Sequence, residues 1–443
     1  MSNEPASTVS LSHQPGTGAG GKAHHSINPT EIAAGVIIGR TSEFFDFFVY
    51  AIASVLVFPK LVFPYADALT GTLDSFAVFA LAFIARPFGT LIFTKIDRAY
   101  GRGVKLTIAL FLLGTSTVAM AFLPGYDQVG WWSVTLLSLF RIGQGLAIGG
   151  GWSGLAPLLA MNAPAGRKGW YAMVPQLSAP LGLMAASGLF AYFVGNLSTE
   201  DFLSWGWRYP FFVAFAINVV ALFARLRIVM TPEYTQLFEN RELYPASVGA
   251  TVKAEGRNVV IGAFAPLASF ALFHMVTVFP LSWIFLFTRH SSAEFLVVQT
   301  LCSILCIASI IVSGVLADRF GRRLLLGATA GAIAAYSGFA PQLLNGGDTG
   351  EIVFMVFGFI LLGLSFGQAS GAVASNFSAT FRFTGSALTA DLAWLLGAGF
   401  APYIALSLSS HFGLAMVGVY LLSGAFCTMI ALAISGRFAI QNN

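Results

Sequence analysis

The chain consists largely of apolar stretches that are each long enough to cross a lipid bilayer. A helix needs about 20 apolar residues to span hydrocarbon about 30 Å thick. Such stretches are expected at 32–58, 72–94, 105–123, 131–161, 169–196, 207–229, 258–288, 293–317, 324–344, 351–376, 385–408 and 412–435. Charged residues make up only 9% of the chain, which is too few to coat a soluble protein of this length. The sequence therefore predicts an all-α polytopic membrane protein with twelve helices embedded in a lipid bilayer.

The positions of lysine and arginine predict how these helices are oriented. Seventeen of the 23 Lys and Arg residues fall in the tails, the loops and the adjoining ends of the expected spans on the side of the N-terminus, and three fall on the other side. Basic loops stay in the cytoplasm, so we expect both termini there and the protein in a bacterial inner membrane. The expected segments are a disordered tail at 1–30, a six-helix half at 31–229, a cytoplasmic inter-half loop at 230–257, a second six-helix half at 258–436 and a cytoplasmic tail at 437–443.

The two expected halves share short motifs at equivalent places. Gly101-Arg102, after the second expected helix, recurs as Gly321-Arg322 after the eighth. A Gly-Gln pair likewise occurs in the fourth helix of each half. Parallel repeats of six helices are the layout of major facilitator transporters, which place their substrate site between the halves near the bilayer midplane.

Several motifs carry a resemblance to a known family. Residues 314–323 read GVLADRFGRR and match the G-x-x-x-D-R-x-G-R-R signature of the major facilitator superfamily. More narrowly, the chain resembles the metabolite:proton symporter family. The matching stretches are Glu43–Phe47, Arg86–Gly89, Arg141 with Gln144-Gly145, Trp205–Arg208 and Arg382–Gly385. The resemblance implies a major facilitator fold and proton-coupled uptake of a small polar metabolite, such as citrate, α-ketoglutarate, shikimate, proline or betaine, by alternating access.

The chain departs from the family pattern at four places. Asp97 lies one position early in the first cytoplasmic signature, so that Arg98 takes the family's Asp position. Gly151 stands where many relatives have Glu, Arg40 where they usually have Asn, and Asp391 in place of an Asn. The last three departures change the charge of the expected cavity, so the substrate of a particular relative does not transfer to this chain.

The first expected helix carries the main candidates for proton coupling. Arg40, Glu43, Asp46 and Tyr50 fall within one arc of its surface at about 100° per residue. Two neighbouring acids in a low dielectric raise each other's affinity for a proton, so Glu43 and Asp46 are the expected coupling pair. A structural ion pair is the alternative interpretation. Asp391 is a third candidate, because it is an acid inside the eleventh expected helix.

Arg141, in the fourth expected helix, is the expected counter-ion of this acid pair. An ionised Glu43 or Asp46 would hold the guanidinium, and protonation would free it for a substrate carboxylate. Gln144, one turn further, is expected to contact substrate as well. A purely structural tie between Arg141 and Glu43 would give the same sequence. Three intramembrane arginines, at positions 40, 86 and 141, favour an organic anion as substrate.

The remaining expectations concern further binding residues and a cytoplasmic gate. Substrate contact is expected from Arg40, Tyr50, Trp152, Gln176, His274 and Trp283. A lone histidine such as His274 is also often a packed core residue. The expected gate consists of Arg86, Asp97, Arg98, Arg102, Asp318, Arg319 and Arg322.

Two other functions compete with anion symport. A zwitterionic osmolyte, such as betaine or proline, would be held by the acids and by aromatic rings such as those of Phe44 and Phe48. A membrane sensor without transport would usually need a folded output domain, for which the tail and the inter-half loop are too short. No metal-ligand cluster or catalytic motif is found, so we expect no enzyme activity, no cofactor and no metal. The expected partners are a small-molecule substrate, protons and lipid, with no nucleic acid, and the expected functional state is a monomer.

Overall fold

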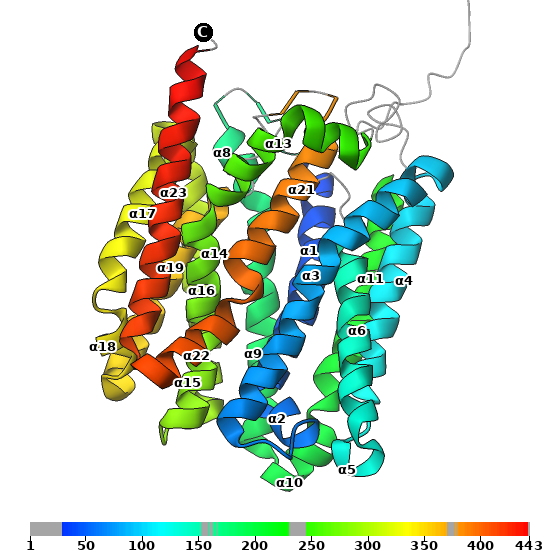
Figure 1. Ribbon diagram of the computed structural model, residues 1–443, viewed down its shortest axis with the longest axis vertical. Coiled ribbons are helices and arrows are strands. Elements are labelled where there is room, and N and C mark those ends of the chain that lie inside the picture. The colour runs from blue at the N-terminus through cyan, green and yellow to red at the C-terminus, as the bar shows by residue number, and fades with distance from the viewer. Residues whose placement is uncertain are drawn as a thin grey trace, which may run out of the picture.

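The computed structural model describes residues 29–151, 159, 163–164, 166–229, 245–369, 377–378 and 380–441. All regular elements in these ranges are helices (Figure 1), which confirms the all-α prediction. The expected N-terminal tail up to residue 28 lies outside the described residues, as does most of the inter-half loop.

The N-terminal part of the chain supplies the right-hand group of helices in Figure 1 and most of the central ones. Its helices are α1 (Pro29–Leu56), α2 (Phe58–Leu61), α3 (Ala68–Tyr100), α4 (Arg102–Ala121), α5 (Tyr126–Val129), α6 (Trp131–Gly150), α8 (Lys168–Met173), α9 (Ser178–Asn196), α10 (Thr199–Asp201) and α11 (Arg208–Val229). A 3-10 turn at Val174–Leu177 joins α8 to α9, and a π-helical turn at Phe202–Gly206 precedes α11.

The C-terminal part supplies the left-hand group of helices. Its helices are α13 (Val248–Phe264), α14 (Leu267–Thr277), α15 (Phe279–Phe287), α16 (Ser292–Phe320), α17 (Arg322–Ser337), α18 (Ala340–Leu344), α19 (Gly347–Ala369), α21 (Arg382–Trp394), α22 (Ala401–Phe412) and α23 (Ala415–Gln441). A π-helical turn at Leu395–Gly399 joins α21 to α22.

Nine helical segments in the described part of the chain are long and apolar enough to cross a membrane. Three more of the twelve expected spans are occupied by α1, which carries four charged residues, by α6, which carries Arg141 and Gln144, and by α17, which has 16 residues. Large apolar side chains such as Phe111 and Phe223 are exposed on the outside of the bundle. Such an exterior suits contact with lipid rather than with water.

Three expected boundaries differ from the structure. The span expected at 258–288 is broken, since α14 ends at Thr277 and α15 begins at Phe279, next to Pro280, which cannot continue the hydrogen-bond ladder of a helix. The expected loop at 230–257 contains the first half of α13, which lies across the upper end of the bundle (Figure 1). The expected C-terminal tail is helical as far as Gln441, because α23 continues through it.

The repeated Gly-Arg motif forms the same turn twice. Gly101 joins α3 to α4 with φ of +83°, and Gly321 joins α16 to α17 with φ of +87°. In each turn the glycine N–H donates to a carbonyl four residues earlier, at 3.0 Å. Positive φ is accessible to glycine without steric cost. The Gly-Arg motif therefore recurs in the sequence because both turns need a residue with positive φ.

Close helix contacts hold the polar residues in place. α6 packs tightly on α3, and a Cβ on Gly149 would collide with the backbone carbonyl of Arg86. Between the two parts of the chain, α9 packs on α16, and α3 packs on α21 and α22. A side chain on α3 therefore faces helices that follow it by about 300 positions in the sequence.

Candidate functional site

Glu43 on α1 forms an ion pair with Arg225 of α11. The Arg225 Nη2 lies 2.7 Å from Glu43 Oε1, and both side chains are largely buried. Arg141 was expected as the partner of Glu43. That expectation is wrong for this structure, because the end of α11 packs against α1 and brings Arg225 against Glu43 instead.

Asp46 lies one turn further along α1, where it is 2% exposed. Asn218 of α11 donates from Nδ2 to Asp46 Oδ2 at 2.6 Å, and Ser42 donates to Asn218 Oδ1 at 2.9 Å. The Thr117 hydroxyl of α4 also lies beside the carboxylate. Within the described residues, Asp46 Oδ1 has no hydrogen-bond partner of its own by distance and angle. The carboxylate therefore has one satisfied oxygen and one that is available for a proton.

Arg141 on α6 is 1% exposed and is held by neutral groups. Its Nε donates to the Phe79 carbonyl at 3.2 Å, and its Nη1 donates to Gln144 Oε1 at 2.9 Å. The guanidinium lies 4.1 Å from the ring centroid of Tyr50 and 4.7 Å from that of Phe79. Cation–π contacts of this kind stabilise a buried charge without neutralising it. Arg141 thus keeps its full positive charge for another partner.

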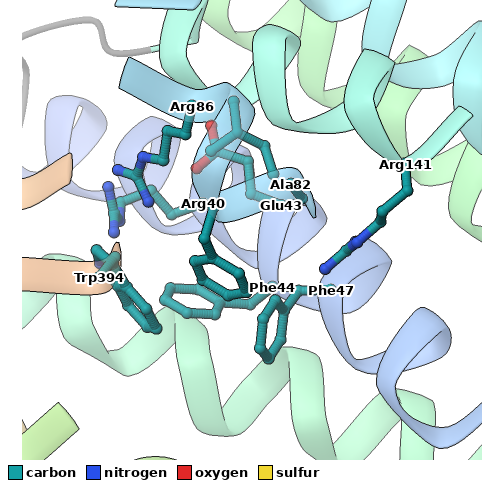
Figure 2. A pocket seen from close by; sticks show the side chains of 10 residues that line it. Arg40, Glu43, Phe44, Phe47, Ala82, Arg86, Arg141 and Trp394 are labelled. Atoms are coloured by element: carbon teal, nitrogen blue, oxygen red, sulfur yellow. The ribbon is translucent and has the colours of Figure 1, made fainter. Parts of the chain in front are cut away.

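A cavity of about 50 Å³ opens between the two parts of the chain beside these residues. It is lined by Arg40, Glu43, Phe44, Phe47, Ala82, Phe83, Arg86, Arg141, Ile148 and Trp394. Figure 2 shows Arg40 and Arg86 together on one side and Arg141 reaching toward Phe47 from the other. A space of this size holds a few water molecules, so a substrate larger than water must widen it. The lining combines three guanidinium groups with four aromatic side chains.

Arg86 and Asp391 connect the two parts of the chain at one wall of the cavity. Arg86 Nε lies 2.6 Å from Asp391 Oδ1, and the Thr90 hydroxyl donates to Asp391 Oδ2 at 2.5 Å. Asp391 comes from α21, whereas Arg86 and Thr90 come from α3. No basic residue lies next to Asp391 in the sequence, and the fold supplies two partners, Arg86 and Thr90, from the other half.

Asp318, in the repeated motif, forms a second contact between the halves. Its carboxylate accepts hydrogen bonds from the backbone N–H groups of Gly169 at 2.6 Å and Trp170 at 3.1 Å. Arg322, four residues later, donates to Gln368 at 3.2 Å and to the Lys168 carbonyl at 3.4 Å. The motif after α16 therefore holds the first turn of α8.

Asp97 lies in the last turn of α3, one position further from its turn glycine than Asp318 is from Gly321. It lies 3.3 Å from Arg102 Nη2 and 3.2 Å from Lys105 Nζ, and all three side chains are buried. These cations also lie over the ring of Phe383 on α21, at 4.6 and 5.5 Å. Arg98, which takes the family's Asp position, is exposed and does not join this cluster. Asp97, an expected gate residue, is thus turned inward and pairs with cations of its own half.

The other expected residues are distributed over several places. Tyr50 lies under Arg141, and Gln176 is buried in the 3-10 turn before α9. His274 is fully buried among aromatic rings, and its two ring nitrogens have no hydrogen-bond partner within the described residues. Trp283 lies in α15, with its ring 4.4 Å from that of Phe287, and does not line the cavity.

Other expected residues do not line the cavity or lie outside the described residues. Arg319 is exposed over the ring of Phe320, so it takes no part in the contact made by Asp318. Arg102, an expected gate residue, is buried together with Lys105. Trp152 lies outside the described residues.

Comparisons with known proteins agree on what kind of protein has this geometry. Residues 32–255 match the model of the sugar (and other) transporter family. The inner membrane metabolite transport protein YhjE of Escherichia coli is 36% identical, over 90% of this chain and 92% of its own. The chain is a major facilitator superfamily transporter. The shikimate transporter of Escherichia coli is 30% identical over 88% of this chain and 91% of its own.

More distant proteins extend the comparison. The proline/betaine transporter of Escherichia coli is 26% identical to this transporter over 89% of this chain and 80% of its own. The xylose transporter XylE from E. coli, in a partially occluded inward-open conformation, superposes with a TM-score of 0.68 at 16% identity. That match covers 93% of this chain and 99% of the other. The shared fold is that of a multi-pass membrane transporter of small metabolites.

Several residues at the candidate site were not singled out from the sequence. Asn218 and Thr117 contact Asp46, Arg225 pairs with Glu43, and Trp394 lines the cavity. Asn218 could have been found from the sequence, because it is a polar residue inside an otherwise apolar helix. Thr117 gives no such signal, because threonine is common in membrane helices and usually bonds its own backbone.

Proposed function

We propose that this transporter is a proton symporter that takes up a small organic anion across the bacterial inner membrane. The observation that carries the proposal is the balance of charge around the cavity. Glu43 is paired with Arg225, and Asp391 is paired with Arg86. Among the described residues, Arg141 and Arg40 have no ion-pair partner. The acid left to balance these two positive charges is Asp46.

This balance links the proton to the substrate. With Asp46 ionised, its charge offsets one of the two guanidinium groups. A proton on Asp46 leaves both groups uncompensated in a medium of low dielectric, where an unpaired charge is strongly unfavourable. Binding of a carboxylate then restores the balance. The proton and the anion therefore favour each other's binding, which is the thermodynamic requirement for symport.

The contacts between the halves would serve as the gate of alternating access. The Arg86–Asp391 ion pair and the Asp318 contacts with Gly169 and Trp170 both join the N-terminal part to the C-terminal part. We propose that this end of the bundle is cytoplasmic, in keeping with its basic residues, and that both termini lie there. These contacts must break for the cavity to open to the cytoplasm. One chain contains the whole cavity, so a monomer suffices.

A counterflow experiment tests the proposal. Purified protein in liposomes is loaded with an unlabelled acid from a panel of mono-, di- and tricarboxylates, and exchange with the labelled acid is measured. The accumulation of that acid is then followed under an imposed inward proton gradient. Exchange with an acid, together with accumulation that an uncoupler abolishes, supports the proposal. Exchange without any response to the proton gradient refutes symport, and the lack of exchange with every carboxylate refutes the substrate class.

The aromatic lining favours a second candidate, a zwitterion such as proline or betaine. Phe44, Phe47, Phe83 and Trp394 surround the cavity, and such rings bind quaternary ammonium groups. A relative named as a proline/betaine transporter supports the same idea. Inclusion of proline and betaine in the counterflow panel separates the two candidates. For a zwitterion held through its cation, truncation of Phe44 weakens binding more than replacement of Arg141 by lysine.

A further inference from the structure

Asp46 and Arg141 are joined by an indirect chain of hydrogen-bonding groups. No ion pair links them directly among the residues that the structure describes. Instead, Arg141 donates to Gln144 Oε1 at 2.9 Å, and Gln144 Nε2 donates to the Thr117 oxygen at 2.9 Å. The Thr117 hydroxyl in turn lies beside the Asp46 carboxylate. Thr117 and Gln144 are each fully buried, so water does not compete for these bonds.

The donors and acceptors of the Thr117 hydroxyl determine the direction of the hydrogen bonds between Arg141 and Asp46. A threonine hydroxyl has one hydrogen and two lone pairs. Because its oxygen already accepts from Gln144, its single hydrogen is available to an acceptor, and an ionised Asp46 is the acceptor beside it. Every donor in the chain then faces toward the carboxylate, from Arg141 through Gln144 and Thr117. Charge-assisted and chained bonds of this kind are stronger than isolated neutral ones.

A proton on Asp46 reverses the direction of donation between Asp46 and Thr117. The Asn218 amide already satisfies Oδ2, so the proton binds at Oδ1, the oxygen without a partner. The new O–H is a donor, so the Thr117 hydroxyl loses Asp46 as the acceptor of its hydrogen. When that hydroxyl rotates toward another acceptor, its lone pairs turn away from the Gln144 amide. At the same time, the negative charge that attracts the Arg141 guanidinium is lost. Gln144 is released from Thr117, and Arg141 is released from the chain toward the cavity.

We propose that Thr117 and Gln144 are positioning residues that transmit protonation of Asp46 to Arg141. This inference rests on the proposed symport of an anion and deepens it. The charged groups that face Asp46 are Glu43 on its own helix and Arg141 on α6, while α4 and α11 present it with uncharged groups. The pH response therefore passes through Thr117 and not through a second titrating partner on those two helices.

The test uses Thr117→Val, which keeps the shape of the side chain and removes the hydroxyl. The matched control is Thr115→Val on the same helix, since Thr115 bonds only backbone carbonyls of α4. Each purified protein is measured for substrate Kd over a range of pH, using the acid that the counterflow panel identifies. Thr117→Ser serves as the conservative variant that restores the hydroxyl. Exchange at equal pH on both sides reports whether each variant is folded and binds substrate.

For the unaltered protein, the Kd is expected to rise about tenfold per pH unit above the titration of Asp46, because one proton accompanies each anion. Thr117→Val should retain exchange but reduce this dependence to about twofold per pH unit. Thr115→Val and Thr117→Ser should keep the full dependence. A Thr117→Val protein with undiminished pH dependence overturns the inference. A Kd of the unaltered protein that does not respond to pH overturns the proposed symport instead, so the two failures are distinguishable.

A double-mutant cycle gives a second, independent reading. Gln144→Met removes the next group in the chain and keeps its volume. If both residues act in one chain, the double variant should lose no more pH dependence than either single variant. Additive losses would show that Gln144 and Thr117 act separately, which overturns the inference. If Thr117→Val fails to exchange substrate, the same cycle built on Thr117→Ala, which also lacks the hydroxyl, and Gln144→Met decides the question.

Discussion

The Arg141 guanidinium is the group whose replacement tests the anion site most directly. In the structure, Arg141 Nε donates to the Phe79 carbonyl and Nη1 donates to Gln144, and the side chain lines the cavity. Release from Gln144 would give a carboxylate two parallel donors. Arg141→Lys keeps the charge but replaces this planar fork with a single ammonium group, which cannot form the same two parallel bonds.

The expected loss follows from the bonds that lysine cannot make. One charge-assisted hydrogen bond contributes about 1.5–3 kcal/mol. Since a tenfold change in affinity corresponds to about 1.4 kcal/mol, the loss of one such bond raises the substrate Kd about ten- to hundredfold. The cation–π contacts with Tyr50 and Phe79 weaken as well. Part of that effect appears as lower thermal stability, which is measured separately.

The assay is a binding titration on purified Arg141→Lys with the acid from the counterflow panel. Arg98→Lys is the matched control, because Arg98 is exposed on α3 and is not among the residues that line the cavity. Equal thermal stability of the two variants removes misfolding as an explanation. Near-native affinity of a folded Arg141→Lys protein would refute the anion site. A loss of equal size in Arg98→Lys would show that the effect is not specific to the cavity.

Three further predictions concern coupling, gating and pH. Asp46→Asn should abolish accumulation under a proton gradient while substrate exchange remains partly active; continued accumulation would contradict the coupling role. Asp318→Asn should slow transport more than Asp97→Asn at matched expression, because Asp318 binds the other half directly while Asp97 pairs within its own; equal or reversed effects would argue against this. Outside the membrane spans, a hydrogen bond to Glu351 raises the pKa of His290 above its usual range. A raised pKa stabilises the protein below the usual histidine range and ceases to do so as pH rises through the elevated value. Thermal unfolding in detergent should follow this trend and should lose it in His290→Gln; an unchanged pH profile in that variant would refute the assignment.

The amino-acid sequence by itself was sufficient to predict the class of fold. A helix in hydrocarbon must satisfy its own backbone groups, so the lengths of the apolar stretches predict the spans without reference to any neighbour. The turns at Gly101 and Gly321 are also local, since they depend on a single residue with positive φ. The same reasoning identified Asp46 and Arg141, because a charge inside an apolar stretch is visible before its surroundings are known.

The identity of the partners was decided only by the tertiary structure. Glu43 was expected to hold Arg141 and instead pairs with Arg225, 182 positions away, while Asp391 finds Arg86 at a distance of 305 positions. Such pairs depend on which helices pack together and on how each is rotated about its axis. A rotation of one residue turns a side chain by about 100°, so hydropathy places a residue in the membrane without determining what it faces. The burial of Asp97 and the link from Asp46 through Thr117 and Gln144 to Arg141 arise in the same way, from the packing of α1, α3, α4, α6 and α11 around one another.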